Sequence, residues 1–280
     1  MTVLETYTAK QVKAHDYDRF LVTLFAPATT REDLFALYAF NHGVAKIREA
    51  VSEPMLGEIR LQWWREAIDG IYADQPRNHE VVLPLHTAVQ RTNIAKEDFI
   101  KIIDARAADI YDENPKILDE FETYLGETSG NLTRIAAQII GEEDEEVLSM
   151  AYELGQVWGL IGTLRAIRYH ISLKKLSLPQ DLMDEFDVKK KDIFAMEGNE
   201  NMQNLIKALC ISAHQYLDHI ATDKKKLSKE MKSLFLLSAL SRSYLNSIKK
   251  ADYNPFEINE RATMFPRQCR LFFSALFGLL

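Results

Sequence analysis

The sequence predicts an all-α fold, a single helical domain over residues 1–280, and three observations support this prediction. Apolar residues recur at helical spacing along most of the chain, and no alternating β-branched run is bounded by Asn-Gly or Asp-Gly turns. Glycine and proline are sparse, at 11 and 8 residues, and fall mostly at the ends of apolar segments. No internal repeat or low-complexity linker divides the chain, which is long enough to bury a substantial core.

Caps and helix breakers set the boundaries of the expected helices. Thr30 offers a hydroxyl N-cap ahead of two acidic residues, whose charges suit the positive end of a helix dipole. Pro54 fits the first turn of a helix, Gly141 can end one, and the acidic run Glu142–Glu146 begins the next. The expected helices, in order, are Ala9–Leu24, Arg31–Ala50, Pro54–Ala73, Val81–Thr92, Lys96–Asp112, Leu118–Ile140, Glu145–Ser172, Pro179–Glu185, Asp192–Phe194, Asn199–Asp223, Lys229–Lys250 and Pro266–Leu279.

Charge and cysteine usage exclude several classes of protein. The formal net charge is −7 and no basic stripe offsets it, so no nucleic-acid partner is expected. Cys210 and Cys269 lack CxxC spacing, and we expect both to be free thiols in a reducing compartment. Residues 1–18 mix charges and lack a continuous apolar run, so neither a secretory signal nor a transit peptide is expected.

The last ten residues, 271–280, are nearly all apolar but too few to span a bilayer, which takes about 18. One interpretation is a terminal helix packed on the core. The other is a peripheral membrane contact, with Arg261, Arg267 and Arg270 just upstream as partners of lipid headgroups.

The most informative motif covers residues 154–170, which read LGQVWGLIGTLRAIRYH and are followed by Leu178-Pro179. This segment resembles the second signature of the squalene/phytoene synthase family, LGxAxQLxNILRDVxEDxxxGRxYLP. The resemblance places the family's two metal-binding aspartates on Ala166 and His170, and its Gln and Asn on Gly159 and Gly162. Two Asp at i and i+4 can share a metal, whereas an alanine methyl offers no lone pair and imidazole is a poor Mg²⁺ ligand.

A second motif lies upstream, where residues 37–49 read LYAFNHGVAKIRE. It resembles the family's first acidic motif, LYAFCRxxDDxxDE. The family's paired aspartates fall on Ala45 and Lys46, and the later one falls on Glu49. The motif's phosphate-directed arginine falls on His42. Taken with the second signature, the resemblance implies a synthase frame that lacks nearly all the acids needed for two-metal prenyl transfer.

Residues 124–130 read YLGETSG and resemble the family's YCYxVAGxVG helix, which lines its prenyl cavity. The small residues here suit either close helix packing or space for a chain. The resemblance therefore implies no catalytic residue and no metal ligand. The candidate cavity or ligand-binding residues, all at matched motif positions, are Tyr38, His42, Tyr124, Gly130, Gly159, Gly162 and Arg165.

Other groups of residues are interpreted as structural. Only one of the adjacent Trp63 and Trp64 can face the core fully, since neighbours on a helix point about 100° apart. We expect Arg65 to pair with Glu66 or another neighbour. The acids between 104 and 113 share a helix with a cation one turn away, and we interpret them as a solvated face in preference to a relocated metal site. These are Asp104, Asp109, Asp112 and Glu113, with Arg106 as the cation, while His214 and His219 are taken as ordinary helix residues.

Within the family, the chain resembles the degenerate branch of mitochondrial complex I (NADH dehydrogenase) assembly factor 6. The similarity lies at Ala39-Phe40-Asn41, Val51-Ser52-Glu53, Ile71–Asp74, Leu164-Arg165-Ala166 and Tyr169-His170. It implies an isoprenoid-synthase-like helical bundle with a central cavity, without cofactor or normal synthase activity. It also implies a partner among complex I subunits or assembly intermediates. The expected location is the cytoplasm or the inner face of a membrane, which is the matrix side in a mitochondrion.

Two other functions stay open at this point. An active or altered prenyltransferase, with Mg²⁺ as cofactor, would need acids carried into the cavity from Glu49 or from the Asp104–Glu113 helix. A lipid carrier or membrane-surface adaptor would use the cavity for a lipid or isoprenoid ligand without assembling anything. In the assembly reading, the cavity could hold a lipid, a quinone tail or an apolar segment of a client.

Overall fold

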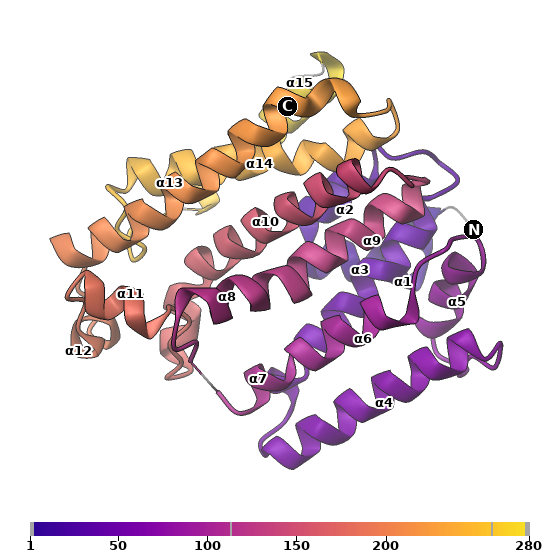
Figure 1. The fold of residues 1–280 in the computed structure, drawn as a ribbon, viewed down its shortest axis with the longest axis horizontal. Helices are drawn as coiled ribbons and strands as arrows, with labels where there is room; N and C mark the ends of the chain where they lie inside the picture. Colours follow the sequence, from indigo (N-terminus) through magenta and orange to yellow (C-terminus); the bar gives the residue numbers. More distant parts are fainter. Residues whose placement is uncertain (1–2, 113, 259, 278–280) are drawn as a thin grey trace.

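The computed structural model describes residues 3–112, 114–258 and 260–277, with side chains in the last range from 265 onward (Figure 1). These residues contain helices and turns but no β-strand, which confirms the all-α prediction. The elements, in order, are η1 Val3–Glu5, α1 Tyr7–His15, α2 Tyr17–Thr23, α3 Arg31–Ala45, η2 Arg48–Ala50, α4 Pro54–Tyr72, α5 Val82–Gln90, α6 Lys96–Ala105, α7 Ala107–Ile110, α8 Leu118–Leu125, η3 Gly126–Gly130, α9 Asn131–Ile140, α10 Glu145–Ser172, α11 Gln180–Glu185, α12 Lys190–Phe194, α13 Glu200–Asp223, η4 Lys224–Lys226, α14 Met231–Lys250 and α15 Glu260–Phe277.

Several helix ends follow the expected local chemistry. Gly141 ends α9 with a left-handed backbone, at φ 105°, and Asp144 caps α10 by accepting a hydrogen bond from the Glu146 amide. Pro54 is the first residue of α4. The prediction that Thr30 caps a helix is wrong. Its hydroxyl donates instead to the Pro27 carbonyl oxygen, 3.1 Å away, and the start of α3 has no side-chain cap.

Two expected helices are broken where the chain changes direction. The first divides at Asp16, whose carboxylate accepts a hydrogen bond from the Arg19 amide and so begins α2 as a separate helix. The segment 96–112 divides at Arg106, which leaves α7 as a single turn of four residues. In contrast, the segment 118–140 is continuous, although its middle, η3, widens into a π-helical turn.

Helix α10 is the centre of the molecule. It lies between α13 and α14 on one side and the continuous α8–η3–α9 segment on the other, with α6 and α4 beyond that segment (Figure 1). A helix with apolar residues on every side needs neighbours on every side, and buried residues occur all round α10. Val157, Leu160, Ile161 and Leu164 are among them, so this helix fixes where its neighbours can pack.

Glycines allow η3 to pack directly on α10. A Cβ atom on Gly155 would lie 2.3 Å from the Ser129 carbonyl oxygen and 2.7 Å from the Gly130 Cα. One helical turn further on, a Cβ on Gly159 would lie 2.9 Å from the Ser129 Cβ. Both distances are too short for ordinary packing, so the approach of the two segments depends on these glycines.

Gly162 differs from the other two glycines on this face of α10. No heavy atom lies within 4 Å of the place where its Cβ would be, apart from its own helix and chain neighbours. The space beside α10 therefore widens from Gly155 toward Gly162, and the wide end opens into the pocket described below.

The tryptophan pair of α4 behaves as predicted. Trp64 is buried with its ring edge-on to Phe40, at 5.3 Å between centroids, while Trp63 is only partly buried. Arg65 pairs with Asp104 across the gap between α4 and α6, at 2.7 Å between the guanidinium and the carboxylate. This arrangement confirms one core-facing tryptophan and an arginine held by a neighbour.

The C-terminal helix α15 packs on α14 but leaves a large apolar area uncovered. Leu271 and Ser274 are buried, as the packed-helix interpretation expects. Residues 278–280 lie outside the described part, as do the side chains of residues 260–264 in this helix. No described helix has the length and apolar character needed to cross a membrane. The large apolar side chains of α15 that are more than half exposed are Phe265, Phe272, Phe273, Leu276 and Phe277.

Cys210 and Cys269 form no disulfide, which confirms the prediction of free thiols.

Two substitutions on α10 test the glycine packing. We expect Gly155→Ala to lower the free energy of unfolding by about 1–3 kcal/mol, because its methyl group would meet backbone atoms that cannot move aside. Gly162→Ala is the matched control in the same helix, and we expect it to raise stability by about 0.5–1 kcal/mol through helix propensity. Urea unfolding monitored by circular dichroism measures both, and equal effects of the two changes would contradict the packing described here.

Candidate functional site

A pocket of about 840 Å³ opens beside the C-terminal half of α10. Its walls come from α10, the α8–η3–α9 segment, η2, α7 and the loop after α10. Its volume lies within the range of about 300–1,000 Å³ that is usual for small-molecule sites. The pocket has an apolar part and a polar part.

The apolar part lies by the middle of α10. Trp158, Gly159 and Gly162 line it from α10, and Leu125 and Leu132 line it from α8 and α9. Gly162 leaves room there that a larger side chain would fill. Trp158 and His170 both line the pocket and are twelve residues apart on α10, which separates them by about 18 Å along the helix. The pocket is therefore long enough for an extended chain.

The polar part is organised around Asp112, which sits just after α7. The Arg48 guanidinium donates two hydrogen bonds to its carboxylate, at 2.6 and 3.0 Å, and the Lys175 ammonium lies 2.6 Å away. The hydrogen bonds from Arg48 hold the pKa of Asp112 below its ordinary value, with Lys175 adding to the effect. One carboxylate thus joins two cations from η2 and from the loop after α10.

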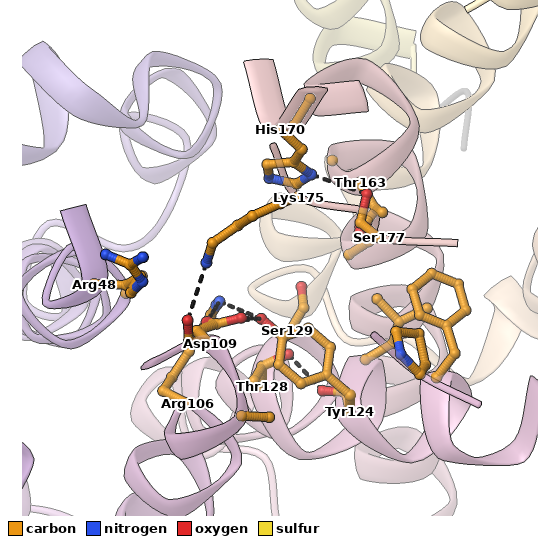
Figure 2. A pocket seen from close by; sticks show the side chains of 18 of the residues that line it. Arg48, Arg106, Asp109, Tyr124, Thr128, Ser129, Thr163, His170, Lys175 and Ser177 are labelled. Atoms are coloured by element: carbon orange, nitrogen blue, oxygen red, sulfur yellow. Dashed lines mark hydrogen bonds and ion pairs between the residues drawn. The ribbon is translucent and has the colours of Figure 1, made fainter. Parts of the chain in front are cut away.

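Asp109 forms a second group in the same wall. Its carboxylate accepts hydrogen bonds from the Arg106 guanidinium and from the Tyr124 hydroxyl, each at 3.0 Å. Its backbone carbonyl accepts a further bond from the Lys175 ammonium at 2.9 Å, as Figure 2 shows. Arg106 also donates to the Tyr124 hydroxyl at 2.6 Å. Burial raises the pKa of Tyr124, so its hydroxyl keeps its proton.

His170 faces the pocket from the last turn of α10. Its Nδ1 lies 2.9 Å from the Ser177 hydroxyl (Figure 2). Burial lowers the pKa of His170, so the ring is neutral at pH 7. His170 is thus a hydrogen-bonded residue of the helix. The other acid at this end, Glu49, is hydrogen-bonded to the Tyr169 hydroxyl.

Arg19 enters the pocket from the start of α2. The break at Asp16 aims it there, and the Asp16 carboxylate pairs with its guanidinium at 2.8 Å. The same guanidinium donates to the Ser129 hydroxyl at 3.3 Å and lies over the rings of Tyr38 and Trp158. Its charge is therefore matched within the protein.

The structure brings most of the residues singled out from the motifs to this one pocket. Others lie elsewhere: Tyr38 is buried beneath Arg19, His42 stacks on His15 at 4.1 Å, and Lys46 is exposed. Gly130 packs against the Tyr152 ring. Those that line the pocket are Ala45, Glu49, Tyr124, Gly159, Gly162, Ala166 and His170.

Arg165 points into a second, smaller cavity of about 340 Å³ on the other side of Trp158. Its guanidinium carbon lies 4.0 Å from the centre of the Tyr244 ring, and Asp18 is 4.0 Å from its nearest nitrogen. Arg165 therefore takes no part in the larger pocket.

The interpretation of residues 104–113 as a solvated face is wrong for Asp109, which is part-buried, whereas Asp112 is exposed as expected but pairs with cations of the pocket. The break at Arg106 turns α7 toward the pocket, so Asp109 and Asp112 line it and hold its cations. Asp104 remains at the surface with Arg65, and Glu113 lies outside the described residues. The pairing of Arg106 with Asp109, three residues apart, was a local signal that could have suggested a buried ion pair.

The pocket does not offer a magnesium site. Ala45 and Ala166 supply no donor atom, and the carboxylates of Asp109 and Asp112 are taken by cations of the protein. Among the residues that the structure describes, no group of three or more His, Cys, Asp and Glu side chains could hold a metal ion. Mg²⁺ needs several oxygen ligands in octahedral geometry, so this donor set does not fit it.

The ion pairs of Asp112 lead to a prediction about stability and pH. Asp112 has a left-handed backbone, at φ 54°, which asparagine also tolerates, so Asp112→Asn removes the charge with little backbone strain. The side chain is 40% exposed, so we expect a loss of only about 0.5–1 kcal/mol at pH 7. A lowered folded-state pKa stabilises the fold above the ordinary value of 3.8, and this contribution disappears as the pH falls through the lower value.

Urea unfolding at several pH values measures this effect, and the difference between wild type and Asp112→Asn should shrink toward acid. Asp252→Asn is the control, since Asp252 has the same backbone conformation, at φ 52°, but no ion pair with a described residue. A loss of stability that is the same at every pH would show that the charge of Asp112 is not what matters.

Comparison with known proteins agrees with this fold. Residues 12–268 match the family model described as squalene/phytoene synthase. The chain is 29% identical over 264 residues to NADH dehydrogenase (ubiquinone) complex I, assembly factor 6, of Bos taurus, covering 94% of this chain and 79% of that protein. It is 24% identical over 242 residues to the presqualene diphosphate synthase of Zymomonas mobilis, covering 81% of each. The squalene synthase structure from Alicyclobacillus acidocaldarius has a TM-score of 0.80 at 18% identity, covering 89% of this chain and 94% of that one, which shows a shared fold.

Proposed function

Because the chain belongs to the squalene/phytoene synthase family, we propose that it is a non-catalytic member that helps to assemble respiratory complex I. The observation that carries the proposal is the internal pairing of charges in the pocket: Asp109 and Asp112 hold Arg106, Arg48 and Lys175 instead of standing free for a metal. The similarity to an assembly factor along 94% of the chain supports the assembly role.

Prenyl transfer from a diphosphate requires that the charge of the leaving group be neutralised. In reactions of this kind, Mg²⁺ bound by carboxylates neutralises it. Removing Asp109 or Asp112 would leave part-buried cations without their ion-pair partner, at a modest cost in stability. Asp109 and Asp112 therefore stabilise the fold, and this is why we rank an altered prenyltransferase second.

A transfer assay tests this part of the proposal. With farnesyl or geranylgeranyl diphosphate and either Mg²⁺ or Mn²⁺, we expect no squalene- or phytoene-type product above background. An active family member run under the same conditions is the control. The double variant Ala166→Asp/His170→Asp should stay silent too, because Ala45 and Lys46 still stand where the first motif has its paired aspartates and Glu49 is its one remaining acid. Turnover by the wild-type protein at the rate of the active control would overturn the proposal.

The assembly role has its own test. We expect deletion of the gene in its host to lower the amount of assembled complex I on native gels, with the individual subunits still made. Expression of the wild-type protein should restore assembly, and so should the Gln138→Leu variant used below. Normal complex I in the deletion strain would leave a lipid carrier or membrane adaptor as the better account.

We further propose that the protein works at the inner face of the respiratory membrane, and that α15 contacts the lipid there. Five apolar side chains on this helix are more than half exposed, and Arg270, also exposed, is placed among them to meet an anionic headgroup. The partner in the proposed role is a subunit or assembly intermediate of complex I, and the pocket would hold a lipid, an isoprenoid or an apolar client segment.

Vesicle sedimentation tests the membrane contact. We expect wild-type protein to sediment with vesicles that contain anionic lipid, and Phe272→Ser/Phe277→Ser to bind them at least about tenfold more weakly, since two large apolar groups no longer leave water. Phe194→Ser/Met196→Ser, which changes two exposed apolar residues at the end of α12, is the control and should bind as wild type does. Equal loss in both variants would remove α15 as the contact.

A further inference from the structure

Three side chains that line the pocket have buried polar atoms without a hydrogen-bond partner in the described part of the protein. They are both amide atoms of Asn114 and the Nε atoms of Arg19 and Arg106. Buried polar groups are nearly always hydrogen-bonded, because leaving one unpaired costs stability. A ligand in the pocket can complete these hydrogen bonds once the side chains turn toward it, and three such side chains around one pocket point to that arrangement.

The charges of the pocket limit what this ligand can be. The described lining residues include four cations and four acids, so their formal charges cancel. Each of the four cations is paired, Arg19 with Asp16, Arg106 with Asp109, and Arg48 and Lys175 with Asp112. The cations in this count are Arg19, Arg48, Arg106 and Lys175, and the acids are Glu49, Asp109, Asp112 and Glu120.

A diphosphate would bring about three negative charges to this neutral surface, without a metal to neutralise them. Burying the diphosphate would be costly, because burying any ion costs free energy unless an unpaired opposite charge is available to it. A free carboxylate or phosphate faces the same obstacle on a smaller scale. An uncharged polar group does not face it.

The unpartnered hydrogen-bonding atoms favour an oxygen atom as the polar group of the ligand. The two arginine Nε atoms and the Asn114 amide nitrogen are donors, and the Asn114 Oδ1 is an acceptor. A hydroxyl or carbonyl oxygen accepts from such donors, and a hydroxyl can also donate to Oδ1. The apolar walls formed by Leu125, Leu132 and Trp158 then suit a hydrocarbon chain attached to that oxygen.

We infer that the pocket takes a hydrocarbon chain ending in an uncharged oxygen group, a hydroxyl or a carbonyl, and that the Asn114 amide binds this oxygen. The inference rests on the proposed non-catalytic role and adds the chemical class of its ligand. Asn114 lies in the loop before α8, and this loop is tied by backbone hydrogen bonds to α11, whose first two amides donate to the carbonyl oxygens of Pro115 and Lys116. The chain itself could be isoprenoid or acyl.

Equilibrium binding of radiolabelled probes tests the head group. Geranylgeraniol and geranylgeranyl diphosphate share one chain and differ only in the head, and the diphosphate is measured with and without Mg²⁺. We expect the alcohol to bind at least about tenfold more tightly than the diphosphate, with no gain for the diphosphate when Mg²⁺ is added. Oleyl alcohol carries the same head on an acyl-derived chain, so comparing the two alcohols distinguishes an isoprenoid source from an acyl one.

Asn114→Leu tests the residue. Leucine has a similar volume and no polar atom, so we expect about tenfold weaker binding of geranylgeraniol with an unchanged or higher Tm for the free protein, because an unpaired buried amide is removed. Gln138→Leu is the matched control. Its amide oxygen is also buried without a partner, but it lies on α9 and does not line the pocket, so binding should not change.

The possible results separate the inference from the function it rests on. Tighter binding of the alcohol, lost in Asn114→Leu and kept in Gln138→Leu, supports the inference. Tighter binding of the diphosphate, or equal binding by Asn114→Leu and wild type, overturns it while leaving the assembly role to the deletion experiment. If neither the isoprenoid nor the acyl-derived probe binds, the inference is overturned, and so is the proposal that the pocket holds a hydrocarbon chain. The assembly role is then tested by the deletion strain alone.

Discussion

The ion pairs of Asp112 and Asp109 are the interactions on which the candidate site depends. Asp112 joins Arg48 in η2 to Lys175 in the loop after α10, and Lys175 reaches on to the Asp109 carbonyl oxygen. Three segments that are distant in sequence are thereby held around one end of the pocket (Figure 2). The same contacts use up the carboxylates that a metal would need. The proposed non-catalytic role rests on the same set of bonds that holds the pocket together.

The other end of the pocket depends on the packing of η3 against α10. Gly155 and Gly130 bring the two backbones into contact, and Gly159 keeps them close for another turn. The space opens only from Gly162 onward, where nothing fills the place of a side chain. Close packing and an open pocket therefore follow one another along a single helix face. The small residues between 126 and 130 therefore serve both purposes that the sequence left open, close helix packing and space for a chain.

Much of this could be predicted from the sequence because it is local. Gly159, Gly162, Ala166 and His170 recur every three or four residues, so they had to share a face of α10 and reach the same space. The partners of Asp112 could not be predicted in the same way. Arg48 is 64 residues before it and Lys175 is 63 residues after it, and only the tertiary fold brings them together. The helix break at Arg106 turns Asp109 and Asp112 toward the pocket. No glycine or proline at this place in the sequence indicated the break.

A magnesium titration tests the central claim, that the charges of the pocket neutralise one another and leave no metal site, most directly. Isothermal titration calorimetry would compare the protein with an active family member, each with and without geranylgeranyl diphosphate. The account predicts that Mg²⁺ produces no heat beyond dilution with this protein, while the active member shows saturable binding. Saturable, diphosphate-dependent Mg²⁺ binding to this chain, similar in stoichiometry and affinity to the active member, would contradict it.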